Sequence, residues 1–192
     1  MAKASFARKS LRLMFWVVVA ALVLMFSIIL LFRFVNPPTS AFMLGYQMGD
    51  AREPLQHEWV PISEVSEWMA LAVIASEDQR FPEHHGVDFK AVHKAVSEYQ
   101  AGEGLRGAST ITQQTAKNLF LWNDRSFVRK AIEAGLALAI DAIWPKQRIL
   151  EVYLNIAEFG PGIYGVQAAS RAYYRIPAGV LSPLQAAHLA AV

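Results

Sequence analysis

The residues best suited to chemistry are two adjacent carboxylates that follow an apolar segment. Glu77 and Asp78 lie within ASEDQRFPEHHG, residues 75–86, directly after a predicted apolar helix. We expect a carboxylate behind that many apolar residues to be half-buried and therefore suited to proton transfer. The alternative interpretation is a solvated helix end without a chemical role.

A second polar stretch, GASTITQQTAKN (residues 107–118), follows the glycine-rich loop GEGLRG at residues 102–107. Gln114 and Lys117 are three positions apart, so they share one face of a helix. Hydroxyls, amides and a lysine at a helix start suit sugar hydroxyls and phosphates. The alternative for this stretch is a polar surface helix. The glycine-rich loop is predicted to be a mobile flap that closes over a substrate, and its alternative is a plain solvated connection between helices.

A third candidate group opens the apolar segment at residues 125–144. Arg129 and Glu133 have the i,i+4 spacing of a surface ion pair, or of a carboxylate that faces a phosphate-binding cation. The chain has no cysteine, which excludes cysteine–zinc sites and catalytic thiols. His84 and His85 are adjacent and would make a poor chelate, so no metal site is predicted.

The elements that position these residues begin with an uncharged run at residues 13–32. At about 1.5 Å per residue, a helix of this length spans the roughly 30 Å of a bilayer's hydrocarbon. Basic residues precede it, which predicts a cytoplasmic N-terminus and an exported domain: Lys3, Arg8, Lys9 and Arg12. The run is too long for a cleaved signal peptide, so we predict an uncleaved signal anchor at residues 13–35.

Composition excludes two classes of protein. The chain of 192 residues is 54% hydrophobic, which is too apolar for a disordered protein. Five of the 18 Lys and Arg residues lie within residues 1–34, so the remainder carries 13 basic against 16 acidic residues. The body is therefore not a polycation, and no nucleic-acid partner is predicted.

Helical patterns dominate after a proline-containing linker. Ser63 and Asp88 are predicted to cap two helices, the second with Val92, Ala95, Val96 and Tyr99 inward and a stop at Gly102. Further helices are predicted at residues 109–119, 126–144, 146–158 and 164–174, and from 182 to the end of the sequence. Strand signals are sparse, so the predicted fold class is mainly α.

Four segments, in order, resemble the motifs of the family 51 glycosyltransferases, the peptidoglycan transglycosylases of bacterial cell-wall synthesis. They are EDQRFPEHHG (77–86), GASTITQQTAKN (107–118), RKAIE (129–133) and KQRILEVYLN (146–155). The resemblance covers roughly residues 60–192 and implies a lysozyme-like helical domain behind a single transmembrane helix. It also implies polymerisation of lipid II into β-1,4-linked glycan, with inversion and release of undecaprenyl diphosphate, at the periplasmic face of the bacterial inner membrane.

The resemblance assigns roles by position. Glu77 matches the family's catalytic base and Glu133 its second important carboxylate. The fourth motif looks mainly structural, with Tyr153 among its packing residues. By the same resemblance, the donor's diphosphate is bound by Lys117, Arg125 and Arg129. The family's polar motif is matched by Ser109, Gln114 and Asn118, and the site is shaped by Phe81 and His84.

The resulting expectation has four parts: a basic cytoplasmic tail at 1–12, the anchor at 13–35, a linker and membrane-proximal segment at 36–60, and a C-terminally truncated glycosyltransferase domain at 61–192. Its partners would be lipid II, the growing lipid-linked glycan chain, the membrane and cell-division proteins. The resemblance allows a divalent cation, Mg²⁺ or Mn²⁺, although no ligand cluster demands one. The alternative functions are a lytic transglycosylase or lysozyme-like enzyme and a non-catalytic division scaffold.

Overall fold

The computed structural model describes residues 2–49, 53–102, 107, 109–124 and 126–191. The chain divides into two compact units, Met1–Asn36 and Pro37–Val192. The first unit contains the helix α1 (Ala2–Phe32). Its candidate membrane span Arg8–Phe32 has 25 residues and contains an 18-residue stretch with a mean hydropathy of 3.0, so α1 is long and apolar enough to cross a membrane.

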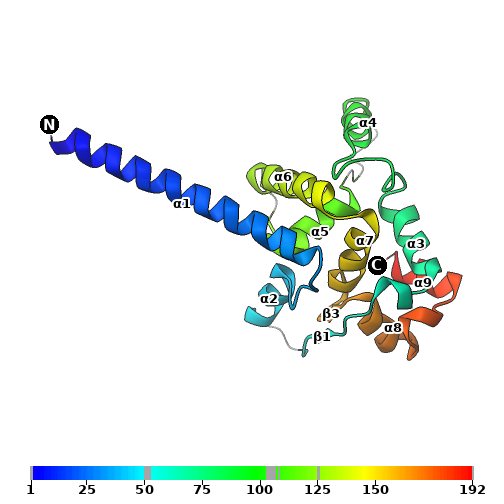
Figure 1. The fold of residues 1–192 in the computed structure, drawn as a ribbon. Coiled ribbons are helices and arrows are strands. Elements are labelled where there is room, and N and C mark those ends of the chain that lie inside the picture. Colours follow the sequence, from blue (N-terminus) through cyan, green and yellow to red (C-terminus); the bar gives the residue numbers. More distant parts are fainter. Residues whose placement is uncertain (1, 50–52, 103–106, 108, 125, 192) are drawn as a thin grey trace. The chain divides into compact units, whose positions relative to one another are not determined.

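The second unit is mainly helical, as predicted, with one small sheet (Figure 1). Its described residues also form two 3₁₀ turns, Ile62–Glu64 and Ala178–Val180. The helices are α2 (Ala41–Met48), α3 (Glu67–Glu77), α4 (Phe89–Gln100), α5 (Ile111–Phe120), α6 (Phe127–Ile143), α7 (Lys146–Ile156), α8 (Val166–Tyr174) and α9 (Pro183–Leu189).

The sheet has the strand order β1-β3-β2, formed by β1 (Gln56–His57), β2 (Glu158–Gly160) and β3 (Ile163–Tyr164). Strand β1 pairs in parallel with β3, and β2 pairs antiparallel with it. The segment 36–60, expected to be a linker, therefore contributes both α2 and β1 to this unit, which begins at Pro37.

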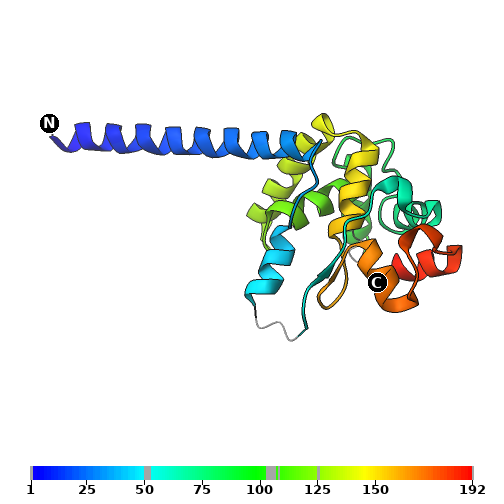
Figure 2. The ribbon, with the colours of Figure 1, turned by 60° about the horizontal axis from the view of Figure 1, so that its bottom comes forward.

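Helix α5 is central to the packing of the second unit. It packs against α6 and α7, while α3 packs against α9, and α5 and α7 lie side by side (Figure 2). Although α5 is rich in polar residues, most of its side chains are buried. At the start of α5, the cap residue Thr110 and the helix residue Gln113 form a capping box, in which each side chain accepts the backbone N–H of the other.

Side-chain caps begin several helices where the sequence predicts them. The Asp88 carboxylate accepts the N–H groups of Lys90 and Ala91 at 3.0 Å, and Ser126 caps α6. Two predicted starts were wrong. Helix α3 begins after Ser66 rather than Ser63, because Ile62–Glu64 forms a 3₁₀ turn. Helix α5 is capped by Thr110 instead of Ser109.

The prediction of an inward apolar face on α4 was mostly wrong. Ala95 is buried, but Val92, Val96 and Tyr99 are exposed. Amphipathic spacing identifies an apolar stripe without saying whether another element covers it. The last helix ends at Leu189 instead of continuing to the end of the sequence. Of the predicted flap, residues 103–106 lie outside the described part of the chain.

Candidate active site

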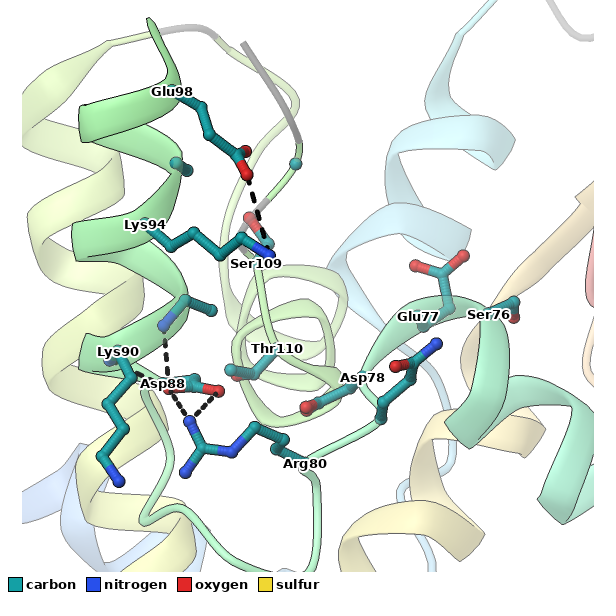
Figure 3. Close-up of a pocket in the computed structure, with 14 residues that line it drawn as sticks. Ser76, Glu77, Asp78, Arg80, Asp88, Lys90, Lys94, Glu98, Ser109 and Thr110 are labelled. Carbon is teal, nitrogen blue, oxygen red and sulfur yellow. Dashed lines mark hydrogen bonds and ion pairs between the residues drawn. The ribbon is translucent and has the colours of Figure 1, made fainter. Parts of the chain in front are cut away.

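A cleft of about 500 Å³ lies between the end of α3, helix α4 and the residues just before α5. Figure 3 shows Glu77 at one end and the α4 side chains Lys90, Lys94 and Glu98 along the opposite wall. Arg80 bridges the middle, with Nη1 3.0 and 3.1 Å from the two carboxylate oxygens of Asp88. The cleft lining thus includes two ion pairs, Arg80–Asp88 and Lys94–Glu98.

Glu77 is the last residue of α3, and its side chain is exposed. The expectation of a half-buried carboxylate was wrong, because the buried residues of α3, Met69 and Val73, are further back along the helix. One oxygen of Glu77 accepts a hydrogen bond of 2.6 Å from Nε2 of Gln114. An exposed carboxylate held from one side can meet a substrate hydroxyl.

The neighbouring carboxylate, Asp78, is buried and has a structural task. It accepts hydrogen bonds from Nε2 of His84 at 2.8 Å and from the backbone N–H of Ile111 at 3.0 Å. Asp78 therefore ties the first motif to the first residue of α5. This connection brings Glu77 and Gln114, which are 37 positions apart, to hydrogen-bonding distance.

A glycine allows the loop of the first motif to lie against α6. Gly86 has φ +73°, and a Cβ at this position would lie 2.6 Å from the carbonyl oxygen of Ala137. The carbonyl of Gly86 also accepts a 2.6 Å hydrogen bond from Oγ1 of Thr110, the cap of α5. The conformation and the close approach both require glycine here.

Glu133 is the centre of a charged cluster. Its side chain is 2% exposed, and it accepts a hydrogen bond of 2.5 Å from Nη1 of Arg129. Lys130 also donates to Glu133, and donates to Oγ of Ser109 at 2.6 Å. Because Ser109 lines the cleft, this bond joins the buried cluster to the cleft wall.

Lys117 lies within electrostatic reach of the Glu77 and Glu133 carboxylates. Burial lowers the pKa of Lys117, and the charges of Arg129 and Lys130 lower it further, while Glu133 and Glu77 act in the opposite direction. The Lys117 ammonium lies 5.1 Å from the ring centre of Phe42 on α2. The geometry thus gathers three cations beside the carboxylates.

Other predicted residues have different surroundings. Asn118 and Phe81 are buried. The Phe81 ring lies under the Lys146 ammonium at 4.7 Å and edge-on to His84, so it supports the first motif by packing. Arg125 lies outside the described residues.

Three residues make contacts at the site that the sequence pattern did not predict. Lys130 could have been found, because it is three positions from Glu133 and therefore on the same helix face. Asp78 was singled out, but one of its bonds is to His84, six positions away in an irregular loop, and the other is to Ile111, 33 positions away. Tyr153 was assigned to packing, although its hydroxyl donates to Oε1 of Gln114 at 3.3 Å. No local spacing signals such long-range bonds.

The described residues do not offer a metal site of their own, since no three His, Asp or Glu side chains among them converge. Glu133 is already paired with two cations. A divalent cation here would need ligands from the substrate.

Comparison with known proteins first gives the class of enzyme. A family model described as "Transglycosylase" matches residues 45–192, which contain the whole cleft. The helical fold and the four sequence motifs agree with this match. The chain is therefore a glycosyltransferase.

The relatives define the particular family. A "Biosynthetic peptidoglycan transglycosylase" of Marinomonas sp. (strain MWYL1) is 58% identical over 176 residues, covering 91% of this chain and 76% of the relative. A protein of the same name from Shewanella frigidimarina is 59% identical, covering 82% of this chain and 68% of the relative. Another from Pasteurella multocida is 54% identical, covering 89% of this chain and 72% of the relative. The chain belongs to the peptidoglycan transglycosylase family, which confirms the resemblance found in the sequence.

Proposed function

We propose that this peptidoglycan glycosyltransferase extends glycan by joining lipid II to a growing lipid-linked chain, with Glu77 as general base. The observation that carries the proposal is the exposed Glu77 carboxylate, held by Gln114 at the end of the cleft, with Lys117 in electrostatic reach. Family membership supports the substrate class.

The reaction is an inverting displacement at the anomeric carbon of the donor. The 4-hydroxyl oxygen of the acceptor forms the new bond to this carbon while the bond to the diphosphate oxygen breaks. Glu77 takes the hydroxyl proton, and the electron pair of the broken bond leaves with undecaprenyl diphosphate. Diphosphate is a good leaving group, so no general acid is needed on its side.

The cations around Glu133 serve the leaving group. Lys117 is half-buried, and a partly desolvated cation stabilises developing negative charge more strongly than one in water. Arg129 is largely enclosed by its bonds to Glu133 and to the carbonyl of Asp124, so it acts mainly as a fixed positive charge. Such preorganised electrostatic stabilisation is commonly a large part of enzymatic rate enhancement.

The apolar helix α1 fits a substrate that stays in a membrane. We propose a single-pass protein of the bacterial inner membrane, with its N-terminus in the cytoplasm and its catalytic unit in the periplasm. Basic residues before the apolar segment support this orientation. Contact with cell-division proteins stays a prediction.

The direct test is to incubate the purified chain with lipid II and to resolve the products by gel electrophoresis. A ladder of lipid-linked glycan is the expected result. The same preparation is incubated with isolated cell-wall sacculi. Soluble fragments from sacculi without polymer from lipid II would instead show a lytic enzyme, and neither product would favour a non-catalytic scaffold.

A further inference from the structure

Three helices meet in a chain of hydrogen bonds that ends on Glu77. Tyr153 of α7 is 7% exposed, and its hydroxyl donates to Oε1 of Gln114 on α5 at 3.3 Å. Nε2 of Gln114 then donates to Oε2 of Glu77, at the end of α3, at 2.6 Å. This series of hydrogen bonds therefore begins in the core and ends on the Glu77 carboxylate, which faces the cleft.

The direction of these bonds follows from the partners. A carboxylate only accepts, so Gln114 must present its NH₂ group to Glu77 and its carbonyl oxygen to Tyr153. The hydroxyl of Tyr153 must then donate. Burial raises the pKa of Tyr153, and the nearby charge of Glu77 adds to the effect, so the hydroxyl keeps its proton. Tyr153 thus holds the Gln114 amide in the orientation that Glu77 needs.

We propose that Tyr153 is a positioning residue for the reaction and acts through Gln114 to hold Glu77 in the orientation that accepts the acceptor's proton. The inference rests on the proposed role of Glu77. Glu77 is exposed at a helix end, and within the described part of the chain the hydrogen bond that the structure gives its carboxylate comes from Gln114. A base with this little support depends on that bond for its orientation.

The position of Tyr153 explains why the amide does not turn. Tyr153 belongs to a run of buried residues on α7, Val152 to Ile156, that packs beside α5. Its ring is therefore held by the core while its hydroxyl reaches the amide. A rigid donor on a core helix restricts the Gln114 side chain, which otherwise has several rotatable bonds.

The test removes a single oxygen atom. Tyr153→Phe is expected to lower kcat on lipid II by about 3- to 10-fold, the loss typical of one neutral hydrogen bond, with little change in KM. The acidic limb of the kcat/KM profile should also move to higher pH, because a less ordered Gln114 stabilises the ionised carboxylate less well. A purely structural role would lower thermal stability without moving the pH profile.

Tyr173→Phe is the matched control. The Tyr173 hydroxyl donates to the carbonyl of Phe159 at 2.8 Å, away from the cleft lining, so this variant also loses one tyrosine hydrogen bond. It should keep the wild-type kcat and pH profile. Equal profiles for Tyr153→Phe and wild type, or an equal loss in Tyr173→Phe, would overturn the proposal.

A double-mutant cycle tests whether Tyr153 acts through Gln114. In a Gln114→Met background, Tyr153→Phe should cause no further loss of kcat, and a fully additive loss would contradict the relay. Glu77→Gln is measured alongside. If Glu77→Gln polymerises normally, the proposed base is wrong. If it is inactive while Tyr153→Phe matches wild type, only the role of Tyr153 fails.

Discussion

At the scale of residues, the two carboxylates of this site have opposite surroundings. Glu133 is buried between Arg129 and Lys130, whereas Glu77 is exposed and accepts one amide hydrogen bond. Removing one member of a buried ion pair typically costs about 3–5 kcal/mol, because the partner charge stays buried. We infer that Glu133 positions the cations, and that Glu77 is the carboxylate able to reach a substrate hydroxyl.

Lys117 gives a prediction about pH. Burial, with Arg129 and Lys130, lowers the pKa of Lys117 from its ordinary value of 10.5, so its positive charge is lost at lower pH than that of a surface lysine. Lys117→Arg should therefore move the alkaline limb of kcat/KM to higher pH, because arginine stays protonated. Initial rates on lipid II, measured from about pH 7 to about pH 10.5, check this.

Lys117→Ala completes that series. Loss of the charge should lower kcat by about 10²-fold, the scale typical of one preorganised group at a developing negative charge. Wild-type kinetics in the alanine variant would remove Lys117 from the diphosphate site.

At the scale of elements, Gly86 determines how closely the first motif approaches α6. Gly86→Ala combines a positive φ with a contact of 2.6 Å to the backbone of Ala137, so we expect a destabilisation of at least about 1–3 kcal/mol. Thermal unfolding should show a lower Tm, and polymerisation should fall because Gly86 also anchors Thr110.

Gly135→Ala serves as the control for this loss. A Cβ at Gly135, within α6, meets nothing within 4 Å. This variant should gain about 0.5–1 kcal/mol, because alanine is the better helix former. Equal Tm values for Gly86→Ala and wild type would show that the approach of the motif to α6 is looser than described.

The cap of α4 predicts a second pH dependence. Burial alone would raise the pKa of Asp88, but the Ala91 N–H, the Arg80 guanidinium and the Lys90 N–H together lower it below 3.8. A lowered carboxylate pKa stabilises the fold above the unfolded value, and this stabilisation is lost as the pH falls through the folded value. Asp88→Ala should cost about 1 kcal/mol at neutral pH.

Denaturant unfolding at a series of pH values tests this account of Asp88. The difference between wild type and Asp88→Ala should shrink as the pH falls below 3.8. Asp88→Asn, which keeps a capping oxygen but loses the charge facing Arg80, should be intermediate at neutral pH. A difference that stays constant down to about pH 2 would contradict the electrostatic part of the argument.

Local signals predicted the elements better than their environments. Asp88 was identified as a cap because capping is a property of neighbouring residues in the sequence. The exposure of Val96 and Glu77 could not be predicted, since burial depends on which distant element packs nearby. The bond from Tyr153 to Gln114 joins residues 39 positions apart, so no helical periodicity reports it.

At the scale of the whole molecule, the residue pattern predicted a membrane helix followed by a helical domain. The apolar run and the four motifs were sufficient for this, because each is a continuous feature of the sequence. The small sheet was missed, since β1 pairs with β3 across more than a hundred residues and each strand has only two.

The orientation of α1 gives the prediction at this scale. With an N-terminal tag, protease added outside spheroplasts should digest the catalytic unit and leave the tag protected, without prior cleavage of the anchor. Protection of the catalytic unit with loss of the tag would contradict the proposed orientation, in which the catalytic unit lies in the periplasm.

The central claim is that Glu77 is the general base of glycan polymerisation, and Glu77→Gln tests it most directly. Glutamine keeps the size of the side chain but cannot take a proton. The account predicts that the variant keeps the wild-type melting temperature and loses about 10²- to 10⁴-fold in the rate of glycan formation from lipid II, measured by gel electrophoresis. A near wild-type rate in this variant would contradict it.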